Sequence, residues 1–188
     1  MNPEREPTDL DLRTLAAEIR EIGFSCRRCG ACCQPGAGDS GLVFVSHDEV
    51  GALVASGAGS WEDVARPYPE FIPRRDGSAV TFGWCIVHEG GRCRFLTDGG
   101  CTAYDARPWI CRTYPFALAD GELAVSDCPG LGEPISEEDA LALAKDLLER
   151  ARCEAADEER VTGVYASVRI PAGKRCVIDG SGIRVLDD

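Results

Sequence analysis

Four cysteines occupy eight consecutive positions in the stretch FSCRRCGACCQPG, near the start of the chain. They are Cys26, Cys29, Cys32 and Cys33. Cysteines this close together serve as disulfide partners, zinc ligands, iron–sulfur ligands or redox dithiols. C-x2-C is the two-ligand turn of structural zinc sites, and C-x2-C-x2-C is an arrangement that holds cubane iron–sulfur clusters. The spacing therefore indicates metal or redox chemistry.

A second group of cysteines begins sixty residues later, in GRCRFLTDGGCTAYDARPWICRTYPF and SDCPGLG. Its members are Cys93, Cys101, Cys111 and Cys128. The two groups together supply eight thiols, enough for two sites of four thiolates each. Cys128 precedes a proline, as the remote ligand of an iron–sulfur cluster often does. Adjacent side chains usually diverge, so Cys32 and Cys33 favour a polynuclear or two-site arrangement over one tetrahedral zinc.

Five arginines lie near these cysteines in the sequence. They are Arg27, Arg28, Arg94, Arg107 and Arg112. Positive charge lowers the pKa of a thiol and so favours the thiolate, the form that binds a metal. We expect Arg107 and Arg112 to orient ligands by hydrogen bonds to sulfur. The alternative is that Arg107 forms an ion pair with an acidic residue, beside aromatic residues of the core.

Composition limits the other possibilities. The chain has 188 residues, 44% of them hydrophobic, which suits one globular domain with a real core. Neither a secretory signal nor an apolar run long enough for a membrane span is visible, so we expect a cytoplasmic protein. In a reducing compartment, clustered cysteines are more often metal ligands than disulfides, and the odd total of eleven also disfavours complete pairing.

The formal net charge of −12 disfavours nucleic-acid binding. A basic protein partner would suit this charge, although the sequence identifies none. There is no G-x-S-x-G, P-loop, H-E-x-x-H or G-x-G-x-x-G motif, so no catalytic residue is assigned.

The full pattern of C-x2-C-x2-C-C, C-x-F-L, C-x3-Y-x2-R-P-x2-C-R-x-Y-P-F and C-P-G resembles the CxxCxxCC cysteine-cluster family of YkgJ type. The resemblance runs from about Phe24 to Gly130 and includes all eight cysteines. It implies a zinc- or iron-chelating domain. Some larger proteins with this module are described as flagellin lysine N-methylases, but no S-adenosylmethionine-binding loop is recognisable here.

Three functions remain open at this stage. The leading one is metal binding by eight thiolates, with zinc, iron or 4Fe–4S clusters as the cofactor. With zinc, four sulfurs would fill the coordination sphere and the protein would be a structural or interaction module. With iron, electron transfer or an iron-dependent redox or protein-modifying enzyme would follow. An open coordination position would favour the enzyme.

The remaining cysteines and histidines carry weaker signals. Cys85 and His88 would extend the site as C-x2-H-x4-C, or else they are a strand-end cysteine and a solvated histidine. We assign no role to His47, Cys153 or Cys176.

We expect an α+β fold with an irregular, metal-organised cysteine core flanked by amphipathic helices and short antiparallel strands. Helices are predicted over 9–22, from 47 after a capping box of Ser46 and Glu49, and over 136–155. Strands are predicted over 41–46, 79–84 and 122–126, with two or three more from 164 onwards. No internal repeat is evident, and the acidic stretch 153–160 is interpreted as a solvated helix end. The expected division is an N-terminal helix (1–23), the cysteine domain (24–130), and a helix with a short β tail (131–188).

Overall fold

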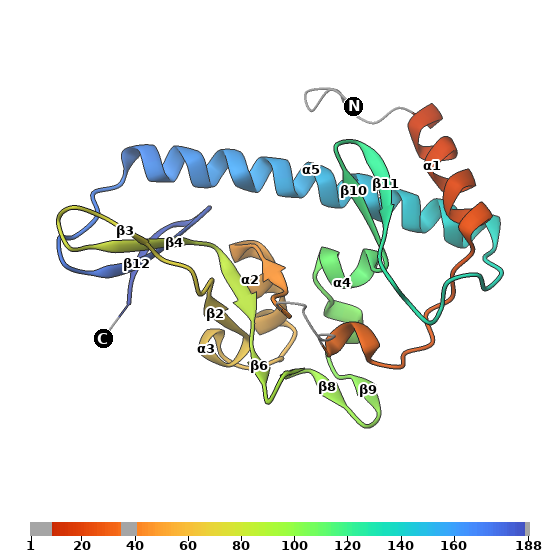
Figure 1. The fold of residues 1–188 in the computed structure, drawn as a ribbon, viewed down its shortest axis with the longest axis horizontal. Helices are drawn as coiled ribbons and strands as arrows, with labels where there is room; N and C mark the ends of the chain where they lie inside the picture. The colour runs from red at the N-terminus through yellow and green to blue at the C-terminus, as the bar shows by residue number, and fades with distance from the viewer. Residues whose placement is uncertain (1–8, 35–40, 187–188) are drawn as a thin grey trace.

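A computed structural model describes residues 9–34 and 41–186 of the chain (Figure 1). The α-helices of this part are α1 (Asp9–Ile22), α2 (His47–Ala55), α3 (Trp61–Val64), α4 (Trp109–Thr113) and α5 (Glu137–Ser167). The short 3-10 helices are η1 (Ala31–Cys33) and η2 (Tyr104–Ala106). Helix α5 runs along the length of the molecule, with α1 near one end and strands β3, β4 and β12 near the other (Figure 1). The α+β class is confirmed.

The strands are short and form several small sheets. They are β1 (Phe44–Val45), β2 (Ala65–Pro67), β3 (Ile72–Pro73), β4 (Ala79–Phe82), β5 (Trp84–Ile86), β6 (His88–Glu89), β7 (Arg92–Cys93), β8 (Leu96–Thr97), β9 (Gly100–Cys101), β10 (Phe116–Ala119), β11 (Glu122–Val125), β12 (Arg175–Asp179) and β13 (Gly182–Val185). The sheet orders are β1-β5-β2 and β13-β12-β4-β3, and the remaining strands form the hairpins β6–β7, β8–β9 and β10–β11. All pairs are antiparallel except β12 with β4, which is parallel. The expected short antiparallel strands are confirmed, and this parallel pair is an addition to them.

Two predicted helix starts are confirmed in detail. Helix α1 covers the predicted 9–22. At α2, the Ser46 side chain accepts a hydrogen bond from the Glu49 amide, while the Glu49 carboxylate accepts one from the Ser46 amide. This capping box satisfies backbone donors that the first turn of a helix leaves unpaired.

Helix α5 is longer than predicted. It begins after the Ser136 cap, as expected, but ends at Ser167, so residues 164–167 are helical and not a strand. Val161 and Val164 pack against the cluster of Val80, Cys176 and Ile178 in the sheet below, and this contact outweighs their β propensity. The acidic stretch 153–160 therefore lies within the helix, where Arg160 pairs with Asp157 and with Asp48.

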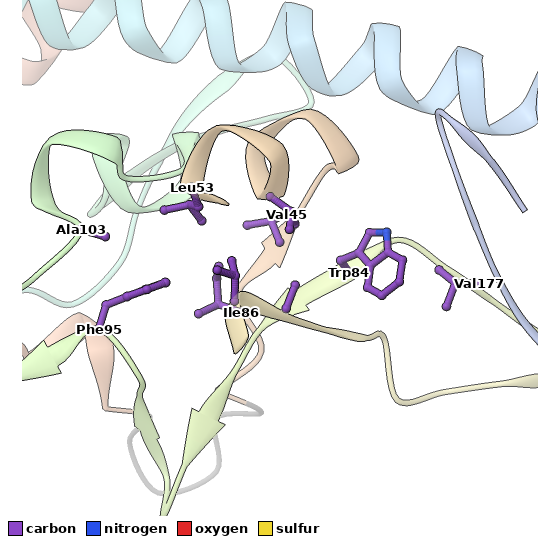
Figure 2. Packing of buried hydrophobic residues seen from close by; sticks show 10 residues of the cluster. Val45, Leu53, Trp84, Ile86, Phe95, Ala103 and Val177 are labelled. Carbon is purple, nitrogen blue, oxygen red and sulfur yellow. The ribbon is translucent and has the colours of Figure 1, made fainter. Parts of the chain in front are cut away.

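The core consists of three apolar clusters. One lies between α1, α5 and β10 and has Ile19, Phe116 and Leu147 among its buried members. The second is the small cluster under the C-terminal half of α5. The third, shown in Figure 2, places Phe95 and Ala103 on one side of Ile86 and Trp84 and Val177 on the other. Cys93 and Cys101 pack against this third cluster, which joins the cysteine segment to the core.

The proposed domain division stays a prediction. The α1–α5 packing and the β12–β4 pair both cross its boundaries. Residues 1–8 of the first segment lie outside the described residues. No helix in the described part of the chain combines the length and the apolar character that a membrane span requires.

Candidate metal centre

Five of the predicted ligands come together from three separate segments. Cys32 and Cys33 lie in η1, Cys93 and Cys101 end strands β7 and β9, and Cys111 lies in α4. Their thiols are close enough to affect one another's ionisation: the charges of Cys93 and Cys32 act on both Cys101 and Cys111. We call this set the inner thiol group: Cys32, Cys33, Cys93, Cys101 and Cys111.

Cys33 is the centre of hydrogen bonding in the inner thiol group. Its Sγ lies 3.9 Å from the Sγ of Cys32, and its thiol also hydrogen-bonds to Cys93. These bonds lower the pKa of Cys32 and of Cys93 to about 6 and raise the pKa of Cys33. Of these three thiols, Cys33 therefore holds its proton most strongly.

Burial affects the other two inner thiols most strongly. It raises the pKa of Cys101 and, with the charges of Cys93 and Cys32, raises the pKa of Cys111 to about 12. A bound cation would remove this penalty, because a coordinating thiol is deprotonated by the metal.

Cys93 and Cys101 occupy equivalent positions in two consecutive eight-residue hairpins. The first unit is VHEGGRCR (87–94) and the second is FLTDGGCT (95–102). Each is closed by the same hydrogen bond, Arg94 N to Val87 O at 3.1 Å and Thr102 N to Phe95 O at 2.8 Å. The two units share a hairpin geometry and not a sequence repeat, because only Gly91 with Gly99 and Cys93 with Cys101 coincide between them.

The residue two positions after each hairpin cysteine fixes the sulfur. The amide of Phe95 hydrogen-bonds to Cys93 Sγ, and the amide of Ala103 hydrogen-bonds to Cys101 Sγ. The side chains of Phe95 and Ala103 are buried in the cluster of Figure 2. Packing of these two residues therefore aims a backbone N–H at each sulfur, and such bonds stabilise a thiolate.

Tyr104 links the first cysteine motif to the second. Its ring lies 4.2 Å from the guanidinium of Arg28 and 3.5 Å from that of Arg107. Arg28 has a φ of 51°, a left-handed conformation that is rare for a residue with a side chain. Arg107 also lowers the pKa of Cys32, after the larger effect of the Cys33 thiol. Arg107 Nε donates to the carbonyl oxygen of Tyr104 at 2.8 Å, so the predicted hydrogen bond from Arg107 to a sulfur stays a prediction.

Helix α4 is anchored from both sides. The Trp109 amide donates to Glu49 Oε1 at 2.8 Å, so the carboxylate that caps α2 also holds the start of α4. Arg112 donates to both carboxylate oxygens of Asp146 in α5. These contacts fix the helix that bears Cys111, and they give Arg112 a structural role.

The other three predicted ligands form an outer thiol group: Cys26, Cys29 and Cys128. Cys26 and Cys29 are exposed, and Cys128 is half-buried. The amide of Gly130 donates to Cys128 Sγ at 3.5 Å, again from two positions onward. The structure therefore brings five of the eight cysteines into one group and leaves these three outside it, whereas the sequence left open which cysteines belong together.

The weaker candidates fall in different places. Cys85 is buried in β5, and burial raises its pKa to about 11. His88 lies opposite Cys93 in the β6–β7 hairpin, with Nδ1 3.1 Å from the carbonyl oxygen of Ile86. Since a carbonyl oxygen only accepts, Nδ1 donates this hydrogen bond and Nε2 is the ring nitrogen that faces away from it, the arrangement typical of a metal-binding histidine.

His47, Cys153 and Cys176 lie in other surroundings. Cys176 is buried in β12, and Cys153 Sγ lies 3.7 Å from a carboxylate oxygen of Glu149 on α5. His47 Nδ1 lies 3.3 Å from Asp179 Oδ2 and 3.1 Å from Ser181 Oγ. Sequence reasoning did not find this polar network, which joins α2 to the C-terminal hairpin.

Within residues 9–34 and 41–186, no three His, Cys, Asp or Glu side chains converge tightly enough to hold one ion. The donor chemistry nevertheless fits zinc or iron: soft sulfurs, two of them with lowered pKa and three with an amide aimed at them. Each thiol moves by rotation about a single side-chain torsion with three staggered positions.

The fold and these thiols define a cysteine-rich α+β protein with a candidate metal centre. The chain belongs to the CxxCxxCC family, described as "Putative zinc- or iron-chelating domain", whose family model matches residues 25–129. The resemblance seen in the sequence is thereby confirmed. No curated protein and no solved structure matches the chain.

Proposed function

We propose that this protein binds zinc or iron through its clustered cysteine thiolates, with the inner thiol group as the principal centre. One observation supports this most directly: Cys32, Cys33, Cys93, Cys101 and Cys111 are brought from η1, two hairpins and α4 into mutual electrostatic contact. Folding such thiols together is unfavourable without a cation, because their negative charges repel and burial penalises them. A divalent metal offsets both effects.

The residues have distinct tasks in this proposal. Cys93 and Cys101 are presented by the hairpins with a backbone hydrogen bond to each sulfur, and Cys111 is held by α4. Cys33 loses its proton when the ion binds, and Arg107 reduces the net negative charge. The Nε2 atom of His88 is a further donor beside Cys93.

Elemental analysis and an ultraviolet–visible spectrum of protein purified without oxygen test the proposal. Iron with acid-labile sulfide and a brown colour would mean iron–sulfur clusters and a redox function. A colourless protein with about two zinc ions per chain would mean a structural or interaction module. A chain that neither carries metal nor takes it up after reduction and reconstitution would overturn the proposal.

A pair of single substitutions tests the ligand assignment. Cys93→Ser is expected to remove metal from the inner thiol group and to lower the melting temperature, because its sulfur contacts Cys33 and receives an amide bond. Cys153→Ser on α5 should change neither, since that thiol contacts only Glu149 among the described hydrogen bonds. Equal metal content in the two variants would contradict the assignment.

A further inference from the structure

A group of exposed cations lies at the end of the molecule opposite α1 (Figure 1). They come from two turns, RRDG between β3 and β4 and PAGK between α5 and β12, and from residues that flank the second turn. The two turns touch: the Ala79 amide donates to Lys174 O at 3.0 Å. A Cβ on Gly77 would lie 3.8 Å from Gly173 Cα. We call this set the basic end: Arg74, Arg75, Arg169, Lys174 and Arg175.

Within the part of the chain that the structure describes, no member of the basic end forms an ion pair with a carboxylate. The only acidic residue in the sequence 71–88 is Asp76, whose carboxylate accepts hydrogen bonds from the amide and the hydroxyl of Ser78. The sequence 161–178 has no acidic residue. Positive charge is therefore concentrated here without local pairing, in a chain whose net charge is −12.

Aromatic side chains hold two guanidinium groups of the basic end. Arg175 lies over the ring of Phe71 at 3.9 Å, and Arg74 Nη1 donates to the hydroxyl oxygen of Tyr165 at 3.4 Å. A guanidinium stacked on a ring keeps the N–H groups at its edge available for a planar contact with an oxyanion. Ile72 follows Phe71 in the chain and is 57% exposed. The basic end thus combines positioned donors with an apolar side chain.

We infer that the basic end is a docking surface for a short acidic segment of a partner protein, in which glutamate or aspartate residues are mixed with apolar ones. Carboxylates match the positioned guanidinium groups, and an apolar side chain matches Ile72. A nucleic acid or an anionic membrane fits less well, because it would extend past the two turns and meet the rest of a chain with a net charge of −12. Docking here would not require a bound metal.

Nuclear magnetic resonance of the isotope-labelled full-length protein tests this surface, because it detects weak binding and locates it. The probe is a short synthetic peptide of glutamate and leucine residues, and its control is the same peptide with glutamine in place of glutamate. We expect the acidic peptide to shift the amide signals of residues 71–77 and 168–175 and to leave those of α1 unchanged. The control peptide should shift neither. About 0.5 M salt should remove the response, because it screens exposed charges.

Charge-reversal variants locate the contact. Arg75→Glu and Lys174→Glu should each weaken binding of the acidic peptide by at least about threefold, because each replaces an attractive charge with a repulsive one. Both side chains are exposed, so the variants should fold, and a thermal melt verifies this. Lys145→Glu is the matched control: it makes the same change of charge at an exposed position of α5 outside the basic end, and it should bind nearly as tightly as wild type.

Several results would overturn this assignment. One is an acidic peptide that shifts no signals, shifts them elsewhere, or loses as much affinity in Lys145→Glu as in Lys174→Glu. Another is tighter binding of an oligonucleotide or of phosphatidylserine vesicles at the same residues, which would make the partner a nucleic acid or a membrane. A third is a shift of the same signals when the protein alone is concentrated, because the acidic segment would then belong to a second copy of the chain.

Discussion

The thiol of Cys33 strongly affects the pKa values of its two neighbours in the inner thiol group. Its thiol lies between Cys32 and Cys93, and the lowered pKa of each neighbour has this hydrogen bond as its largest cause. Adjacent cysteines usually diverge, but the 3-10 turn of η1 brings the two sulfurs to 3.9 Å. The doublet is therefore a cooperating pair within one group.

Alkylation of the metal-free protein should reveal this arrangement. Cys32 is exposed and has a pKa of about 6, so its rate of reaction with iodoacetamide should rise through pH 6 and level off by pH 7 to 8. Peptide mapping by mass spectrometry gives the rate at Cys32 alone. In Cys33→Ala the midpoint should move upward by at least about one pH unit, towards an ordinary thiol; an unmoved midpoint would show that Cys33 is not the cause.

Asp179 illustrates a buried carboxylate held in its charged form. Only 5% of the residue is exposed, and burial alone would raise its pKa. Hydrogen bonds from Ser181 and from Trp84 Nε1, the latter at 2.7 Å, prevail and hold the pKa below its usual value. A carboxylate with a lowered folded-state pKa stabilises the protein above its unfolded-state pKa, and this stabilisation is lost as the pH falls through the folded value.

Asp179→Asn is therefore expected to lower the free energy of unfolding at pH 7 by about 1–3 kcal/mol, because an amide nitrogen would face the donors of Ser181 or Trp84. The difference from wild type should shrink below about pH 4, where Asp179 of the wild-type protein becomes protonated. Urea denaturation at several pH values measures both effects. A pH-independent difference would contradict the charged state.

At the scale of elements, α5 connects two of the three apolar clusters. Its N-terminal half packs on α1 and β10, and its C-terminal half packs on the sheet of β4 and β12. Gly163 lies within the helix and is exposed, and a Cβ added to it would meet no other atom within 4 Å. Glycine lowers helix stability here, and the one side-chain contact shown for it, from Ser167 Oγ to its carbonyl oxygen at 2.9 Å, would be kept by any residue.

Gly163→Ala should accordingly raise the free energy of unfolding by about 0.5–1 kcal/mol, the difference between the helix propensities of glycine and alanine. Gly130→Ala offers the matched contrast: the same added methyl group would meet the Ser25 carbonyl and should destabilise the protein. Thermal or urea denaturation of both variants compares them. A loss of stability in Gly163→Ala would mean that the helix is interrupted there.

Local signals explain which elements were predictable. The Ser46–Glu49 capping box and the α1 periodicity depend on residues within one or two turns, and the sequence displays them directly. The end of α5 was missed because Val161 and Val164 become helical through contacts with strands distant in the sequence.

In the candidate site, too, local features could be predicted from the sequence and long-range contacts could not. Its eight cysteines were visible from their spacing, whereas their division five to three depends on tertiary contacts. The Tyr104 stack and the contact of Glu49 with Trp109 join residues far apart in the chain, so spacing alone could not predict them.

At the scale of the whole molecule, stability is unevenly distributed. The cluster between α1, α5 and β10 has eight buried apolar residues. By contrast, the hairpins of 87–102 consist of two-residue strands joined by glycine turns, and Phe95 is the anchor of the second unit in the core. Short strands and glycine turns predict a locally weak region, which the proposed metal would stabilise.

Removal of metal with a chelator should therefore increase amide hydrogen exchange in residues 87–102 and in η1 well before it affects α1 or the N-terminal half of α5. Exchange measured by mass spectrometry, with and without chelator, checks this gradient. Restoring zinc should restore protection in the same segments. Uniform loss of protection along the chain would show instead that the metal supports the whole fold.

The two eight-residue hairpins are also similar structural units that follow one another directly in the chain. Each unit closes on itself through one backbone hydrogen bond and delivers one sulfur at the same place in its hairpin. Duplicating an octapeptide is a small genetic step, and each duplication would change the coordination number available to a metal by one. The number of sulfurs that this region offers to a metal would therefore follow the number of hairpins in it.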